Sequence, residues 1–314
     1  MWYRPPHVPR RAPALALLAA TLLAATGCAD RPADDGDPGK ITAVAGFYPM
    51  HYLAARVGGP SVAVTSLARP GVEPHDMELT PAQLETVRDA ELVVYLRGVQ
   101  PAVDAAVGDS GDRLFDVATH VPLDAPAEPA GHDGEAEPDG HDEGTTDPHV
   151  WLDPQRYATA AEKLAARLGT LDPPRAAGYT ANAAALRTEL TELDAAYRTG
   201  LATCTRRQIV TSHAAFGYLA RRYQLTQVPI TGISPDQEPA PRRMTEIAAL
   251  ARQYGATTIF FETLVSPKIA ETVARQAGAG TAVLDPIEGV SGADDYPAVM
   301  RRNLATLRQA LGCR

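Results

Sequence analysis

The chain has 314 residues, of which 45% are hydrophobic and 21% charged, a composition that excludes disorder as its main state. The length fits one large domain or two of moderate size. Its 29 basic residues stand against 38 acidic ones, for a net charge of −9. Since no Lys/Arg-rich run follows the first dozen residues, the sequence argues against nucleic acid as a partner.

Residues 1–27 have the features of an export signal. Three arginines precede an apolar stretch from Ala12 to Ala25, and small residues follow it, which is the order of regions in a signal peptide. The apolar stretch is shorter than the roughly 20 residues that a membrane-spanning helix needs. We therefore expect the rest of the chain to be exported.

Cys28 directly follows Ala25-Thr26-Gly27, and this segment resembles a bacterial lipobox. The resemblance implies that Cys28 carries a lipid that anchors the protein to the outside of the cell membrane. Residues 28–40 are rich in Asp, Pro and Gly and are expected to form a flexible tether. A plain secretory signal with an incidental cysteine is the alternative.

The chain contains three cysteines. If Cys28 is lipidated, Cys204 and Cys313 remain, in a compartment where structural disulfides form. We predict that these two pair, which would tie the start of the C-terminal half to the end of the chain. Two free buried thiols are the alternative.

From Ile41 onward, short β-branched runs alternate with helical stretches. Thr80-Pro81-Ala82-Gln83 has the form of a capping box with Pro at the first helical position, which predicts a helix start. In this half the expected elements are strands Ile41–Ala45, Val62–Ser66 and Glu91–Tyr95, a helix around Met50–Val57 and a helix from Pro81.

The same alternation returns after residue 207. Strands separated by helices indicate parallel sheets, so two α/β lobes are expected. The expected strands are Gln208–Ser212, Gln227–Ile230, Thr258–Phe261 and Thr281–Leu284, and the expected helices are Ala214–Tyr223, Arg242–Tyr254, one opening at Ser266-Pro267, and Asp294–Leu311.

Between the halves, residues 174–202 are predicted to form one long amphipathic helix, because apolar residues recur at spacings of three and four. At about 1.5 Å per residue this helix would span a domain. We expect it to join an N-terminal lobe, 41–173, to a C-terminal lobe, 203–314, each with a mainly parallel sheet flanked by helices. Residues 125–146 are expected to be a mobile acidic loop.

Three histidines and one aspartate have similar local settings. His75 lies in the loop after an expected strand, His149 lies just ahead of a helix, and His213 and Asp285 directly follow strands. Ligands of open α/β sheets bind beyond the carboxyl ends of the strands. Three imidazoles and one carboxylate would suit Zn²⁺. Each histidine alone is more often a hydrogen-bonded loop residue, so the prediction depends on the four together.

Several motifs around these residues resemble those of the solute-binding proteins of zinc/manganese ABC transporters, the cluster A-I family. They occur in the family's order from Ile41 to the end of the chain. They are Phe47-Tyr48-Pro49, Gly71-Val72-Glu73-Pro74-His75-Asp76, Asp147-Pro148-His149-Val150-Trp151-Leu152-Asp153-Pro154, Thr211-Ser212-His213-Ala214-Ala215-Phe216-Gly217-Tyr218, Gly232-Ile233-Ser234 through Glu238-Pro239, and Phe260-Phe261-Glu262.

The resemblance implies a metal bound between two lobes and delivered to an ABC permease with its ATPase. It puts the metal ligands at His75, His149, His213 and Asp285, the four residues already selected. Imidazole at His213 favours Zn²⁺ over Mn²⁺, since manganese-type members tend to have Glu there and carboxylate suits Mn²⁺ better. A manganese-specific protein of the same family is the alternative.

Three further residues have weaker assignments. Glu262 is a candidate to accept a hydrogen bond from a metal-bound imidazole, with a structural role as the alternative. His132 and His141 resemble the His/Asp-rich loop of zinc-type members, and either gather metal or are incidental to a solvated loop.

The expected protein is a monomeric carrier and not an enzyme. An exported zinc hydrolase and a surface adhesin are the other classes considered. Four protein ligands would close the site, whereas catalytic zinc keeps a position open.

Overall fold

The structure is a computed structural model that describes residues 1, 39–108, 111–126, 146–235, 237–290 and 294–314. The elements below all belong to one compact unit, Gly36–Arg314. Cys28, His132 and His141 lie outside the described residues, so the lipid anchor and the role of the 125–146 loop stay predictions.

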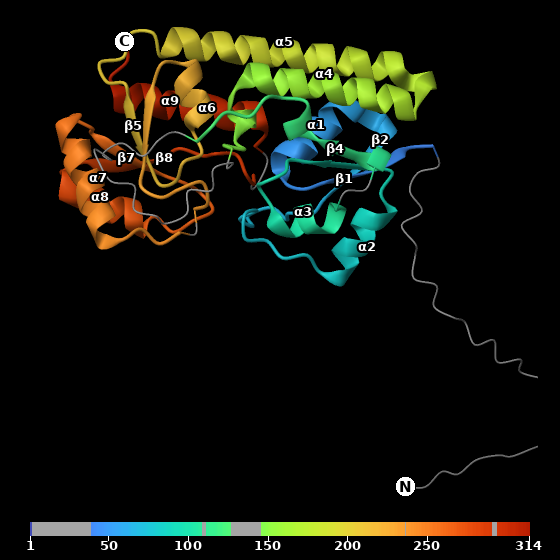
Figure 1. The fold of residues 1–314 in the computed structure, drawn as a ribbon, viewed down its shortest axis with the longest axis horizontal. Coiled ribbons are helices and arrows are strands. Elements are labelled where there is room, and N and C mark those ends of the chain that lie inside the picture. The colour runs from blue at the N-terminus through green and yellow to red at the C-terminus, as the bar shows by residue number, and fades with distance from the viewer. Residues whose placement is uncertain (2–38, 109–110, 127–145, 236, 291–293) are drawn as a thin grey trace, which may run out of the picture. The chain divides into compact units, whose positions relative to one another are not determined.

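The first half of the described chain builds a four-stranded parallel sheet of order β2-β1-β3-β4 (Figure 1). The predicted capping box is present, since the Thr80 side chain accepts from Gln83 N and the Gln83 side chain accepts from Thr80 N. The elements are β1 (Ile41–Ala45), α1 (Tyr48–Gly58), β2 (Val62–Ser66), α2 (Pro81–Asp89), β3 (Leu92–Tyr95), α3 (Pro101–Val107) and β4 (Leu114–Asp116).

The second half repeats this topology in a sheet of order β6-β5-β7-β8, also parallel. In each sheet the chain moves outward first to one side of the starting strand and then to the other, so a topological switch point lies between β1 and β3 and between β5 and β7. The elements are β5 (Gln208–Thr211), α6 (Gly217–Arg222), β6 (Thr226–Pro229), α7 (Pro241–Gln253), β7 (Thr258–Phe261), α8 (Lys268–Ala277), β8 (Gly280–Val283) and α9 (Tyr296–Leu311).

Two long helices, α4 (Pro154–Leu171) and α5 (Ala176–Gly200), run side by side, and α5 extends over both halves of the fold (Figure 1). The 25-residue α5 contacts both halves: Asn182 Nδ2 donates to Val57 O at the end of α1, 3.0 Å away, and Tyr197 Oη donates to Met300 O in α9 at 2.7 Å. The predicted fold of two α/β lobes joined by a long helix is therefore confirmed. The 3₁₀ turns are η1 (Gly59–Ser61), η2 (Gly111–Arg113), η3 (Val117–Thr119), η4 (Val150–Leu152) and η5 (Pro173–Arg175).

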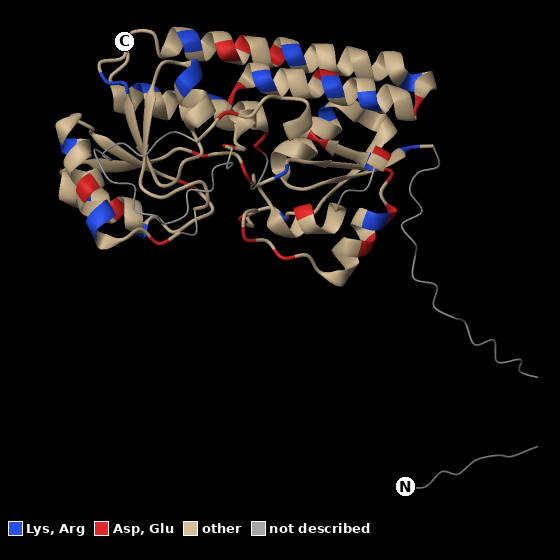
Figure 2. Cartoon of the chain, viewed as in Figure 1, with Lys and Arg blue, Asp and Glu red and all other residues tan. Residues whose placement is uncertain are grey.

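The exposed sides of α4 and α5 carry charges of both signs, interspersed along their length (Figure 2). Arg187 on the exposed side of α5 pairs with Glu162 on α4, and the buried Asp194 of α5 pairs with Arg222 on α6 at 2.6 Å. Such pairs place the two helices relative to each other and to the second sheet, although exposed pairs contribute little stability.

Cys204 and Cys313 form a disulfide across a sequence separation of 109 residues, as predicted. The bond joins the segment after α5 to the segment that follows α9. Since α5 and α9 also contact each other through Tyr197, the covalent bond closes one end of the second lobe.

Replacing both cysteines by serine should lower the free energy of unfolding by about 4–5 kcal/mol, because the chain-entropy cost of a loop this long returns to the unfolded state. Urea unfolding of the parent and the double variant measures the difference. A loss below about 1 kcal/mol would contradict a stabilising role for the bond.

Candidate metal centre

Four loops bring buried side chains to one point. His75 comes from the loop between β2 and α2, His149 caps η4, His213 follows β5 by two residues, and Glu288 lies in the segment after β8. The exposed fractions of these residues are 7%, 0%, 0% and 1%. Strands of both sheets thus supply donors at their carboxyl ends, where ligands of such sheets bind.

One donor atom from each of the four lies within 4.8 Å of the other three. Glu288 Oε1 is 3.3 Å from His75 Nε2, 3.2 Å from His149 Nε2 and 3.5 Å from His213 Nε2. The Nε2 atoms of His149 and His213 are 3.4 Å apart. Three imidazole nitrogens and one carboxylate therefore face a common centre.

The structure places Glu288 in this group, whereas the sequence predicts Asp285 there. Asp285 lies three residues earlier in the same segment, and its two carboxylate oxygens are engaged elsewhere. Oδ1 accepts from Ile287 N at 2.7 Å, and Oδ2 accepts from Thr263 Oγ1 at 3.2 Å.

Glu262, at the end of β7, contacts His213 as the sequence suggested it could. Its Oε1 is 2.6 Å from His213 Nδ1 and also accepts from the Ser212 hydroxyl. The bond directs the opposite ring nitrogen, Nε2, toward the centre. Such a carboxylate fixes the ring orientation and tautomer of an imidazole that binds metal.

Asp147 does the same for His149, a role the sequence reasoning missed. Its Oδ1 accepts from His149 N at 3.0 Å and lies 2.8 Å from His149 Nδ1. Asp147 is fully buried, and Tyr218 Oη donates to its carbonyl at 2.7 Å. An aspartate two residues before a candidate ligand was the signal that could have found it.

The charges of this group strongly perturb one another. Burial alone would raise the pKa of Glu288, but the three imidazoles outweigh it and hold that pKa well below its usual range. Burial alone would lower the pKa of His213, but Glu262 and Glu288 raise it to about 10. The pKa of His149 is raised against burial by Asp147 and Glu288. The group therefore favours positive charge at its centre.

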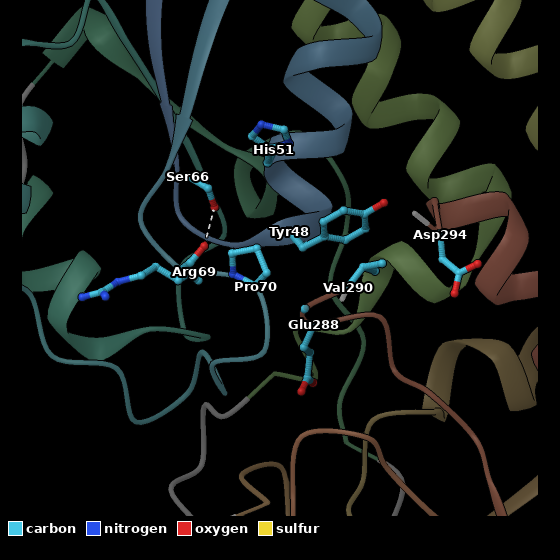
Figure 3. Close-up of a pocket in the computed structure, with 10 residues that line it drawn as sticks. Tyr48, His51, Ser66, Arg69, Pro70, Glu288, Val290 and Asp294 are labelled. Carbon is cyan, nitrogen blue, oxygen red and sulfur yellow. Dashed lines mark hydrogen bonds between the residues drawn. The ribbon is translucent and has the colours of Figure 1, made fainter. Parts of the chain in front are cut away.

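A cavity of about 260 Å³ is lined by Glu288 and, among others, by Tyr48, His51, Pro70 and Val290. In Figure 3 the Glu288 carboxylate points away from Tyr48 and His51. The cavity therefore borders the segment that carries Glu288, while the carboxylate faces the histidines.

Two α/β lobes bridged by a long helix, with a buried three-histidine, one-carboxylate group at their strand ends, define a metal-binding protein of the solute-binding class. A protein-family model described as "Zinc-uptake complex component A periplasmic" (ZnuA) matches residues 43–310. The chain belongs to this family, which confirms the resemblance seen in the sequence.

Sequence relatives of the chain also have names that refer to zinc. "Zinc-binding protein AdcA" of Streptococcus pyogenes serotype M1 is 34% identical over 287 residues, covering 86% of this chain and 56% of that protein. The chain thus spans about half the length of this relative. "High-affinity zinc uptake system protein ZnuA" of Bacillus subtilis strain 168 is 32% identical over 309 residues, covering 95% of this chain and 97% of that protein.

Solved structures resemble the fold. The laminin-binding protein Lmb of Streptococcus agalactiae, described as having adhesin and metal-transporting activity, superposes with a TM-score of 0.76 at 31% identity, over 86% of this chain and 99% of that one. A zinc-bound variant of AdcAII from Streptococcus pneumoniae also superposes with a TM-score of 0.76. Its identity is 28%, over 87% of this chain and 99% of that one.

Zinc affinity should rise steadily from pH 6 to pH 8. The pKa of His213 is raised to about 10 and that of His149 is raised above its usual value, so a metal must displace protons from these imidazoles. The expected gain is on the order of tenfold per pH unit for each displaced proton. Chelator competition at several pH values measures it, and a constant affinity across this range would contradict it.

Proposed function

We propose that this protein is the zinc-capturing component of an ABC importer, and that it delivers Zn²⁺ to a membrane permease served by an ATPase. The observation that carries the proposal is the buried convergence of three Nε2 atoms and one carboxylate oxygen from four loops. His75, His149, His213 and Glu288 would supply the four ligands, a number and type that suit tetrahedral zinc.

Zinc is favoured over manganese by the donor set. Three of the four donors are imidazole nitrogens, which suit Zn²⁺, whereas Mn²⁺ prefers carboxylate, carbonyl and water oxygens. The buried setting adds to this preference, because it leaves little room for the waters that complete an octahedral manganese site. The printed names of the AdcA and ZnuA relatives refer to zinc as well.

Carriage is favoured over hydrolysis by the number of protein ligands. A hydrolytic zinc site keeps one position for water and has a general base beside it. Here the fourth position is taken by Glu288, while Glu262 and Asp147 are hydrogen-bonded to the outer nitrogens of two imidazoles. Both carboxylates thus orient ligands, and the site is built to hold a cation.

Capture outside the cytoplasm agrees with the family model, whose description names a periplasmic component. We further propose that the mature protein is a monomer held at the membrane by a lipid on Cys28. Among the residues that the structure describes, no helix is long and apolar enough to cross a membrane.

The purified protein should bind one Zn²⁺ per chain, more tightly than Mn²⁺. His213→Ala should weaken zinc binding by at least about a hundredfold. It removes a ligand, and it leaves the Glu262 and Glu288 carboxylates without the His213 imidazole that both contact. Metal analysis and competition between the two metals measure both effects.

His120→Gln is the matched control, since it removes an imidazole that stacks on Phe115 away from the centre, with ring centroids 4.5 Å apart. It should leave zinc affinity near that of the parent. Equal losses in the two variants, or preferred binding of Mn²⁺ by the parent, would contradict the proposal.

A further inference from the structure

The segment that carries Glu288 contains a backbone conformation that its sequence disfavours. Ile287 has φ of +64°, in the left-handed region, where a β-branched residue is a genuine outlier. Its side chain is fully buried in the main hydrophobic core. Strain of this kind persists when the surroundings over-determine the conformation, and it concentrates at functional sites.

Asp285 is one of the residues that hold Ile287 in this conformation. Its Oδ1 accepts from Ile287 N at 2.7 Å, which closes a tight turn two residues long of the Asx type. Its own backbone is fixed by Asn303 on α9: Asp285 N donates to Asn303 Oδ1 at 3.0 Å, and Asn303 Nδ2 donates to Asp285 O at 2.7 Å. Asn303 is 2% exposed.

Trp151 holds the same turn from the other half of the molecule. Its Nε1 donates to Pro286 O at 2.7 Å, and its carbonyl accepts from Tyr296 Oη at 2.6 Å. Trp151 is 1% exposed and packs edge-on against Phe47, with ring centroids 5.1 Å apart. The Trp151 bond therefore lies two residues from His149 on one side and two residues from Glu288 on the other.

We propose that Asp285 is a positioning residue for metal binding: its carboxylate holds the left-handed turn at Ile287 that directs Glu288 to the histidines, with Trp151 fixing the turn from the opposite lobe. The inference rests on the proposed function, in which Glu288 is a zinc ligand. It gives a role to the aspartate that the family resemblance had marked as a ligand.

The positioning role of Asp285 requires a hydrogen-bond acceptor at the place of Oδ1. It does not require that this acceptor carry a negative charge. Asparagine offers an acceptor oxygen of the same reach and also forms Asx turns, whereas alanine offers none. If Asp285 instead bound the metal, replacing carboxylate by neutral amide would remove an anionic ligand. In that case the Asp285→Asn and Asp285→Ala variants would both bind zinc much more weakly than the parent.

The test compares Asp285→Ala, Asp285→Asn and Glu288→Gln in the mature protein, by chelator competition with Zn²⁺ and by the visible absorption of the Co²⁺-loaded protein. Asp285→Ala should weaken zinc binding by roughly tenfold to a hundredfold and alter the cobalt spectrum. Asp285→Asn should restore most of that affinity and the parent spectrum. Glu288→Gln should lose more affinity than either.

An Asp285→Asn variant as impaired as Glu288→Gln would overturn the proposal and make Asp285 a ligand. The proposal would also be overturned if Asp285→Asn bound zinc more weakly while Glu288→Gln bound zinc as the parent does. Failure of the parent itself to bind zinc would instead defeat the proposed function, so the two failures are distinguishable.

Trp151→Phe provides a second test if Asp285→Ala does not fold. It keeps a buried ring but removes the Nε1 donor to Pro286. We expect zinc binding about threefold to tenfold weaker, the usual effect of one lost hydrogen bond, with a changed Co²⁺ spectrum. Parent-like affinity and spectrum in this folded variant would overturn the part assigned to Trp151.

Discussion

A buried carboxylate facing three imidazoles is the interaction on which the rest of this structure depends. Removing a charge from water is expensive unless it is paired and hydrogen-bonded, and Glu288 is 1% exposed. Its partners come from loops of both sheets, so the pairing requires those loops to be held together. The raised pKa values of His149 and His213 favour compensating positive charge beside Glu288, and in the proposed function Zn²⁺ takes the place of the imidazole protons.

The surroundings of the group follow from this requirement. Asp147 and Glu262 each bind the outer nitrogen of one imidazole, which leaves the inner nitrogens directed at the centre. The helix α5 touches both lobes, and Trp151 joins the segments that carry His149 and Glu288. These contacts hold the donors in place before metal arrives, so we expect lobe movement on binding to be modest.

Much of the fold and three of the four donors could be predicted from the sequence, because strand and helix periodicities are local and the histidines lie beside recognisable strands or helices. Strand β4 has three residues and was missed, since so short a run has no usable period. Asp285 was selected because it directly follows the expected strand Thr281–Leu284, and Glu288 was not considered. In our proposal, the left-handed turn at Ile287 directs Glu288 to the histidines. No local sequence pattern predicts a positive φ at an isoleucine.

Zinc-edge X-ray absorption of the zinc-loaded protein, measured in parallel on Glu288→Gln, tests the central claim most directly. The account predicts four ligands in the parent: three imidazole nitrogens at about 2.0–2.1 Å and one carboxylate oxygen at about 2.0–2.2 Å. The oxygen shell should change in the variant while the three imidazoles remain. Fewer than three imidazoles, or an unchanged spectrum in Glu288→Gln, would contradict it.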